Sequence, residues 1–189
     1  MHPYDFNREI QSERLLLRKM TLEDAVDIFD YASDVQVSKF TTWENHKNIE
    51  DTLTFLKIIM QKYENNQPSD WGIVHKETNK VIGTCGWVYI NESHHRAEIG
   101  YALSPIYWNQ GIITESMKQV LNLGFNELDI NRIEARCMIG NLGSERVMIK
   151  LGMQFEGLIR EQMFVKESYI NIKMYSILKN EWIQQRFPN

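Results

Sequence analysis

The sequence contains no hydrophobic run that approaches the roughly 18 residues of a membrane span, and its first nine residues lack the apolar region of an export signal. Lysine and arginine form no cluster or stripe, and the formal net charge is −4. Sequence-independent binding of nucleic acid is therefore not expected. These absences predict a cytoplasmic protein that binds neither membranes nor nucleic acid.

Cysteine and histidine are also scarce. The two cysteines, Cys85 and Cys137, each lie inside a strand-like run, so we interpret them as reduced core residues and not as a disulfide or a metal pair. The five histidines are spread along the chain, which argues against a zinc site. No G-x-x-x-x-G-K-[S/T] pattern occurs, so a nucleotide-hydrolysing P-loop is absent. We predict no metal.

The length of 189 residues and the hydrophobic content of 43% suit one domain with a sizeable core. We predict that this domain spans residues 1–189, with its core at about 12–178. Periodicity predicts the order β-α-α-β-β-β-α-β-α-β-β, an α/β protein in which a mixed sheet carries helices on its faces. The predicted strands are residues 15–18, 71–74, 81–88, 96–103, 132–139, 153–159 and 169–178. Residues 179–187 are interpreted as a polar tail.

The segment Ser104–Phe125 is the centre of the predicted fold, because a strand ends there, passes Gly111 and runs into an amphipathic helix. Its apolar residues recur at the spacing of one buried helix face: Met117, Val120, Leu121, Gly124 and Phe125. The first N–H groups of such a helix lack internal partners and lie at the positive end of its dipole. We expect a phosphate site there; the alternative is an ordinary strand-to-helix corner.

Four motifs in register carry a resemblance to a known family. They are S-E-R-L-L-L-R at Ser12–Arg18, A-E-I-G-Y-A-L-S-P at Ala97–Pro105, Y-W-N-Q-G-I-I-T-E at Tyr107–Glu115 and N-L-G-S-E-R-V-M-I-K-L-G-M at Asn141–Met153. With them the chain resembles a GNAT-superfamily N-acetyltransferase of the RimJ/RimL-like branch, the ribosomal-protein alanine N-acetyltransferase type. The resemblance implies the GNAT fold, with a mostly antiparallel sheet that splays at the cofactor site. It also implies homodimerisation.

The implied reaction moves an acetyl group from acetyl-coenzyme A to a primary amine, either a protein N-terminal α-amine or a small amine. The amine attacks directly in a ternary complex, and no covalent enzyme intermediate forms. The alternative is a non-catalytic acyl-coenzyme A-binding or sensing module of the same fold.

The resemblance also implies where the coenzyme binds. The family's pyrophosphate loop, Q/R-x-x-G-x-G/A, falls on Trp108–Ile113, and Trp108, Asn109 and Ile113 depart from the pattern. Since the binding groups are backbone amides, changed side chains are compatible with function, provided that Ile113 points into the core. The implied cofactor-binding residues are Tyr101, Ala102 and Leu103 along the pantetheine arm, Asn109, Gln110, Gly111, Ile112, Ile113 and Thr114 in the loop, and Asn141 and Arg146 opposite.

Two residues are candidates for catalysis. Glu98 lies beside the implied pantetheine slot and is a candidate general base; the alternative is an ion pair with Arg96, Arg132 or Arg136. Ser144 matches the serine that the branch uses to protonate the leaving thiolate; the alternative is a helix N-cap.

The acceptor groove is predicted from loops and aromatic residues. The resemblance places it at residues 33–48 and 165–168. Trp43 and Trp87 are either core residues or walls of this acceptor groove. The identity of the amine cannot be derived from these residues.

Overall fold

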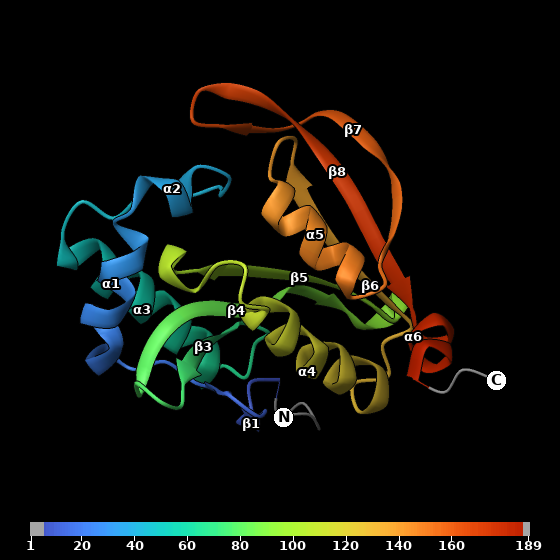
Figure 1. Cartoon of the computed structure of the whole chain (residues 1–189), viewed down its shortest axis with the longest axis horizontal. Helices are drawn as coiled ribbons and strands as arrows, with labels where there is room; N and C mark the ends of the chain where they lie inside the picture. The colour runs from blue at the N-terminus through green and yellow to red at the C-terminus, as the bar shows by residue number, and fades with distance from the viewer. Residues whose placement is uncertain (1–5, 187–189) are drawn as a thin grey trace.

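The computed structural model describes residues 6–186 and contains one eight-stranded sheet, in the order β1-β2-β3-β4-β5-β6-β8-β7 (Figure 1). The strands are β1 (Ile10–Gln11), β2 (Leu15–Arg18), β3 (Asp70–His75), β4 (Lys80–Asn91), β5 (Arg96–Leu103), β6 (Arg132–Met138), β7 (Gln154–Val165) and β8 (Ser168–Leu178). Neighbouring strands are antiparallel except β5 and β6, which are parallel. The predicted mixed sheet is confirmed.

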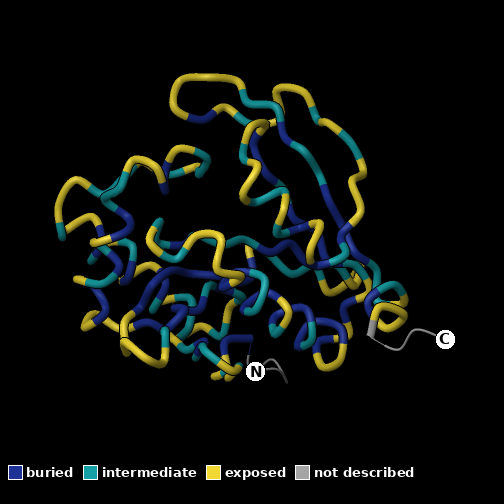
Figure 2. The backbone as a smooth tube through the Cα atoms, viewed as in Figure 1, coloured by how far each residue is buried: buried dark blue, intermediate teal, exposed yellow. Residues whose placement is uncertain are grey.

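Helices cover both faces of this sheet (Figure 1). They are α1 (Ala25–Ala32), α2 (Val35–Ser38), α3 (Ile49–Glu64), α4 (Ile112–Asn126), α5 (Leu142–Lys150) and α6 (Lys179–Arg186). Helix α4 buries all five residues of its predicted apolar face against one side of the sheet. Helices α1 and α3 pack on the other side through a separate cluster that includes Ile28 and Leu56. Figure 2 shows these buried segments along the strands and beneath the helices.

Strands β5 and β6 separate before either one ends. Their register runs from the pair Arg96 and Arg132 to the pair Ile99 and Ala135 and stops there. Strand β5 continues to Leu103 and β6 to Met138. The last residues of both strands therefore face a gap in the sheet, as the predicted splay requires.

Two short motifs set the ends of helices. Thr21 and Asp24 form a capping box ahead of α1. Gly152 ends α5 with a φ of +80°, a left-handed conformation that favours glycine. Both motifs are local and can be recognised from a few neighbouring residues.

The predicted polar tail is wrong, because residues 179–186 form helix α6. The buried Trp182 of this helix packs on Phe125 of α4, with ring centroids 6.2 Å apart. One buried tryptophan in a polar segment gives no periodic signal. Phe187 of the tail and the first five residues of the segment searched for an export signal lie outside the described residues. Within residues 6–186 no helix is long and apolar enough to cross a membrane.

Candidate functional site

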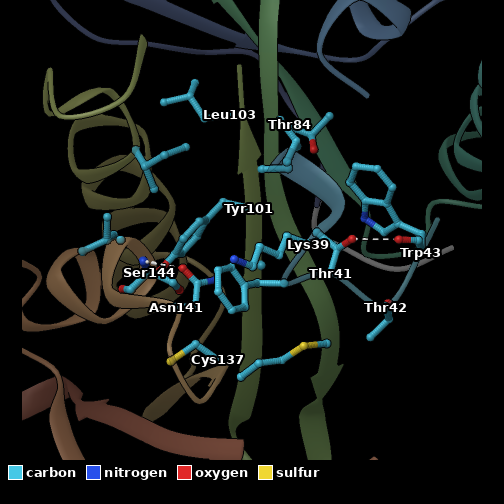
Figure 3. A pocket seen from close by; sticks show the side chains of 18 of the residues that line it. Lys39, Thr41, Thr42, Trp43, Thr84, Tyr101, Leu103, Cys137, Asn141 and Ser144 are labelled. Carbon is cyan, nitrogen blue, oxygen red and sulfur yellow. Dashed lines mark hydrogen bonds between the residues drawn. The ribbon is translucent and has the colours of Figure 1, made fainter. Parts of the chain in front are cut away.

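A cavity of about 1220 Å³ opens where β5 and β6 separate. Its walls come from β5 and β6, from the start of α4 and of α5, and from the segment that joins α1 to α3. In Figure 3, Tyr101 lies between two groups of side chains, with Asn141 and Ser144 on one side and Thr84 and Trp43 on the other. The cavity therefore has a side bounded by α4 and α5 and a side bounded by α1 and α3.

The loop that leads into α4 adopts two left-handed conformations. Asn109 has a φ of +60° and Gly111 a φ of +77°. Glycine adopts this region freely, and asparagine tolerates it better than most other residues. The first helical bond is donated by Glu115 to Gly111 at 2.9 Å, so the preceding amides of residues 112–114 are not committed to the helix. Residues 112–114 line the cavity at the positive end of the α4 dipole, an arrangement whose free amides can bind an anion.

The predicted orientation of Ile113 is confirmed. Its side chain is buried in the core with Met117, and it leaves only backbone at the loop surface. The indole of Trp108 donates to the carbonyl of Leu103 at 2.8 Å and ties the loop to the end of β5. Two of the three departures from the family pattern therefore hold the loop in place, Trp108 against β5 and Ile113 in the core.

A network that the sequence did not predict supports the same loop from the residues just before β2. The carboxylate of Glu115 accepts hydrogen bonds from the Ser12 hydroxyl at 2.7 Å and from the Arg14 amide at 3.0 Å. The Arg14 guanidinium donates to Glu115 at 2.8 Å and to the Gln110 carbonyl at 3.1 Å. Although burial opposes it, these bonds hold the pKa of Glu115 below its usual value. Two of the motifs that carried the resemblance meet here.

Basic side chains surround the loop. Arg146, as predicted, lies on α5 and lines the cavity. Lys118 and Lys150 were not predicted; they line a smaller cavity of about 410 Å³ beside Gly111 and Thr114. Lys118 lies one helical turn after Thr114, and Lys150 lies one turn after Arg146. This spacing is a signal that could have identified both lysines from the sequence.

Ser144 is held by β5, and it is not the cap of α5. Asn141 is the N-cap, since its side-chain oxygen accepts from the Ser144 amide at 3.1 Å. The interpretation of Ser144 as an N-cap is therefore wrong. The Ser144 hydroxyl lies 2.9 Å from the Tyr101 hydroxyl, which also lies 3.2 Å from the Ser144 carbonyl (Figure 3). Burial raises the pKa of Tyr101, so its phenol stays protonated.

Glu98 lines the cavity and is 3% exposed. Both of its oxygens accept from the Arg136 guanidinium, each at 2.5 Å. These bonds raise the pKa of Arg136. Of the three arginines considered as partners, Arg96 and Arg132 instead pair with Glu134. The ion-pair alternative is therefore present, and it holds the Glu98 carboxyl group at the cavity wall.

The two candidate tryptophans lie in different environments. Trp43 lines the cavity, whereas Trp87 is 1% exposed in the core, 6.4 Å from the ring of Trp71. The prediction that Trp87 belongs to the acceptor groove is corrected, because its face of β4 is covered by α4. The two predicted groove loops do meet: Lys166, at the β7–β8 turn, donates to the Ser38 carbonyl at 2.6 Å.

Neither cysteine has the properties of a nucleophile. Both are free and buried. Burial raises the pKa of Cys137, which lines the cavity, to about 11, and it raises the pKa of Cys85 well above its usual value. Both thiols therefore stay protonated near neutral pH. Among residues 6–186 no group of three or more histidine, cysteine or acidic side chains is arranged to hold a metal ion.

Comparisons with known proteins agree with this architecture. An acetyltransferase (GNAT) domain model matches residues 14–154. A relative from Bacillus licheniformis, the uncharacterized N-acetyltransferase p20, is 36% identical over 173 residues, which cover 92% of this chain and 97% of that protein. A crystal structure of a GNAT-family acetyltransferase from Bacillus anthracis superposes with a TM-score of 0.81 at 30% identity and covers 92% of this chain and 99% of that one.

A more distant structure shares the fold. It is the microcin C7 self-immunity acetyltransferase MccE, in complex with acetyl-CoA and AMP, with a TM-score of 0.80 at 21% identity over 88% of this chain and 93% of that one. The family model matches well over half of the chain, and the curated relative is similar along nearly its whole length. The chain therefore belongs to the GNAT acetyltransferase family, has the GNAT fold and is an acyltransferase.

Proposed function

We propose that the protein transfers an acetyl group from acetyl-coenzyme A to a primary amine by direct attack in a ternary complex. The observation that carries this proposal is the splay of β5 from β6, which opens directly onto the loop before α4. A long donor with phosphates at one end and a thioester at the other fits such a slot. The MccE structure, which holds acetyl-CoA on the same fold, supports this choice of donor.

The donor is held mainly by backbone. The amides of residues 112–114 and the α4 dipole bind the pyrophosphate, and Arg146 adds a positive charge from α5. The protein carries a net charge of −4, so long-range attraction does not favour a polyanion and a local site is required. The pantetheine arm lies along Tyr101–Leu103, with Asn141 opposite.

Glu98 and Ser144 are proposed for the two proton transfers. The amine nitrogen attacks the thioester carbon, and its proton passes to Glu98, directly or through a water molecule. A carboxylate oxygen has two lone pairs, so the bonds from Arg136 leave each Glu98 oxygen one acceptor position. As the C–S bond breaks, the Ser144 hydroxyl donates its proton to the thiolate, and the serine oxygen regains a proton from solvent. Tyr101 orients that hydroxyl through their 2.9 Å contact.

The acceptor is a protein N-terminal α-amine or a small amine. An α-amine has an unperturbed pKa near 8, against about 10.4 for lysine. Part of the α-amine is therefore neutral at cytoplasmic pH, and the base need not deprotonate that part before the attack. The motifs shared with the RimJ/RimL-like branch support this class of acceptor. The location proposed is the cytoplasm, where the two free cysteines stay reduced.

A homodimer is proposed from the resemblance. Strands β7 and β8 supply the surface, because Phe155, Leu158, Phe164 and Tyr169 are exposed there. Sedimentation of the purified protein tests this, and a monomer at micromolar concentration would contradict it.

The alternative is a module that binds the coenzyme without turnover. An assay for free coenzyme A thiol, run with pools of peptides, amino acids, polyamines and aminoglycosides, separates the two functions. Thiol release that depends on an added amine supports the enzyme. If acetyl-coenzyme A binds and no amine provokes release, the module is the correct function.

A further inference from the structure

Asp70 is an acidic side chain in the cavity that the proposed mechanism does not use. It opens β3 and lines the side of the cavity bounded by α1 and α3. Its backbone carbonyl accepts from the Tyr63 hydroxyl at 2.5 Å, which fixes the residue. Within the described part of the chain, no hydrogen bond or ion pair reaches its carboxylate.

The surroundings of this carboxylate do not neutralise it. Burial raises the pKa of Asp70 to about 6, and the opposing influence comes from Lys62 of α3, which makes no ion pair with it within the described residues. The other titratable groups that interact with it are Tyr31 of α1, Tyr63 of α3 and, from the opposite face of β4, Cys85; burial keeps all three protonated. Near pH 7 the Asp70 carboxylate is mostly ionised although the residue is only partly exposed, and a charge held largely away from water without a partner is costly.

The register of the sheet places Asp70 at a defined distance from the splay. Asp70 pairs with Gly86 on β4, and Gly86 pairs with Gly100 on β5, one residue beyond the last pair between β5 and β6. Two strand spacings separate Asp70 from Gly100, roughly 10 Å. Neither glycine has a side chain, and a Cβ atom on Gly100 would meet only Val88, at 3.1 Å. At Gly86 the backbone of Ser69 and Asp70 lies too close for any side chain, which holds Asp70 against β4, whereas Gly100 leaves its part of the cavity floor open.

We propose that Asp70 binds a second positive charge of the acceptor, so that the substrate is a dibasic amine with one amine at the splay and the other at Asp70. This inference rests on the proposed acetyl transfer. Allowing for the reach of an aspartate side chain, the two nitrogens lie roughly 6–8 Å apart, which about four or five methylene groups span. The linker passes Thr84, Val88 and Trp43, which also line the cavity.

Two kinds of molecule offer this chemistry. One is an aliphatic diamine or polyamine. The other is a peptide with a lysine directly after its N-terminal residue, whose two nitrogens are nine bonds apart and reach this separation when the flexible side chain folds back. The test therefore uses matched pairs: 1,5-diaminopentane against 1-aminopentane, and alanyl-lysine amide against alanyl-norleucine amide. Each pair keeps the reacting amine and the apolar linker and removes only the second charge.

The variants are Asp70→Asn, which keeps the shape and removes the charge, and Asp51→Asn as a control. Asp51 lines the same cavity, but it is exposed and its carboxylate accepts from the Lys47 amide at 2.7 Å. We expect kcat/KM for the dibasic member of the preferred pair to fall at least about tenfold in Asp70→Asn, because a buried charge pair is broken. The monobasic member and Asp51→Asn stay within about twofold of wild type. The pair with the larger loss identifies the source of the substrate.

The outcomes separate this inference from the proposed function. If wild type acetylates both members of each pair equally, or Asp70→Asn slows both equally, the second-charge site is refuted while the transferase function stands. If wild type acetylates no amine, calorimetric titration of 1,5-diaminopentane and of alanyl-lysine amide into the coenzyme A complex still decides the site. Binding that is weakened in Asp70→Asn supports it, and equal or absent binding overturns it.

Discussion

The buried pair of Glu98 and Arg136 allows a prediction whose size follows from the structure. The Glu98 side chain is 4% exposed and the Arg136 side chain 29%, and two bonds of 2.5 Å join them. Replacing Arg136 with methionine keeps much of the side-chain volume and leaves the carboxylate without its partner. Breaking a buried pair in this way costs about 3–5 kcal/mol, and the partial exposure of Arg136 places the loss near about 3 kcal/mol. For a chain of this length the melting temperature should fall by about 6–12 °C.

Thermal unfolding of Arg136→Met, Glu98→Gln and the double variant measures this pair. The double variant should be more stable than Arg136→Met alone, since it no longer buries an unpaired carboxylate. Kinetics then test the role of Glu98 as a base. Glu98→Gln should lower kcat and move the pH optimum upward, because the remaining rate depends on the fraction of neutral amine, and it should leave coenzyme affinity unchanged.

Two results would refute this reasoning. A loss below about 1 kcal/mol in Arg136→Met would mean that the pair does not hold the charge as described. A pH–rate profile of Glu98→Gln that overlays the wild-type profile would remove Glu98 from the mechanism. Either result leaves the other half of the argument intact, because one concerns stability and the other the reaction.

Three further predictions concern the rest of the cavity. Ser144→Ala should lower kcat by about 10²-fold and Tyr101→Phe by about fivefold, with coenzyme affinity unchanged in a direct titration; full activity in Ser144→Ala would exclude it as the acid. Gly111→Val should weaken coenzyme binding about tenfold, because a β-branched residue at a φ of +77° is strained by about 1–2 kcal/mol. Asn109→Gly should bind the coenzyme as wild type does. Equal affinities of the two variants would contradict an amide site shaped by this loop. Because the folded pKa of Asp70 is raised from 3.8 to about 6, its ionisation lowers stability as pH rises through that interval. Asp70→Asn should therefore be more stable than wild type at pH 7 by about 2–3 kcal/mol and lose that advantage at pH 4, as equilibrium unfolding by urea would show.

The sequence predicted the elements whose signals are local. The buried face of α4 repeats every three or four residues, and all five of its predicted positions are buried. The turn at Gly111 was also found, and there the backbone is left-handed, with a φ of +77°. These features depend on a few neighbouring residues and on nothing distant.

What the sequence did not provide depends on contacts between distant segments. The choice of Arg136 over Arg96 and Arg132 as the partner of Glu98 is set by how β5 and β6 align, and three arginines on nearby strands look alike in sequence. Trp87 and Trp43 were both candidates for the acceptor groove, and the packing of α4 decides that Trp87 is core. The resemblance narrowed the site to a few segments, and the tertiary structure then assigned the partners.

Several departures from local rules gather at the same cavity. The loop before α4 holds Asn109 in a left-handed conformation. Strands β5 and β6 stop pairing after Ile99. The Asp70 carboxylate is largely buried without a partner. Each of these features lowers the free energy of unfolding of the isolated protein. In a well-packed domain, such destabilising features occur mainly at functional sites, where a bound ligand compensates for them. A phosphate on the loop amides, an extended arm beside β5 and an ammonium at Asp70 would each relieve one of them. The three costs lie along one cavity, so a single ternary complex accounts for all of them, and this is the physical reason to look for the acceptor's charge at β3.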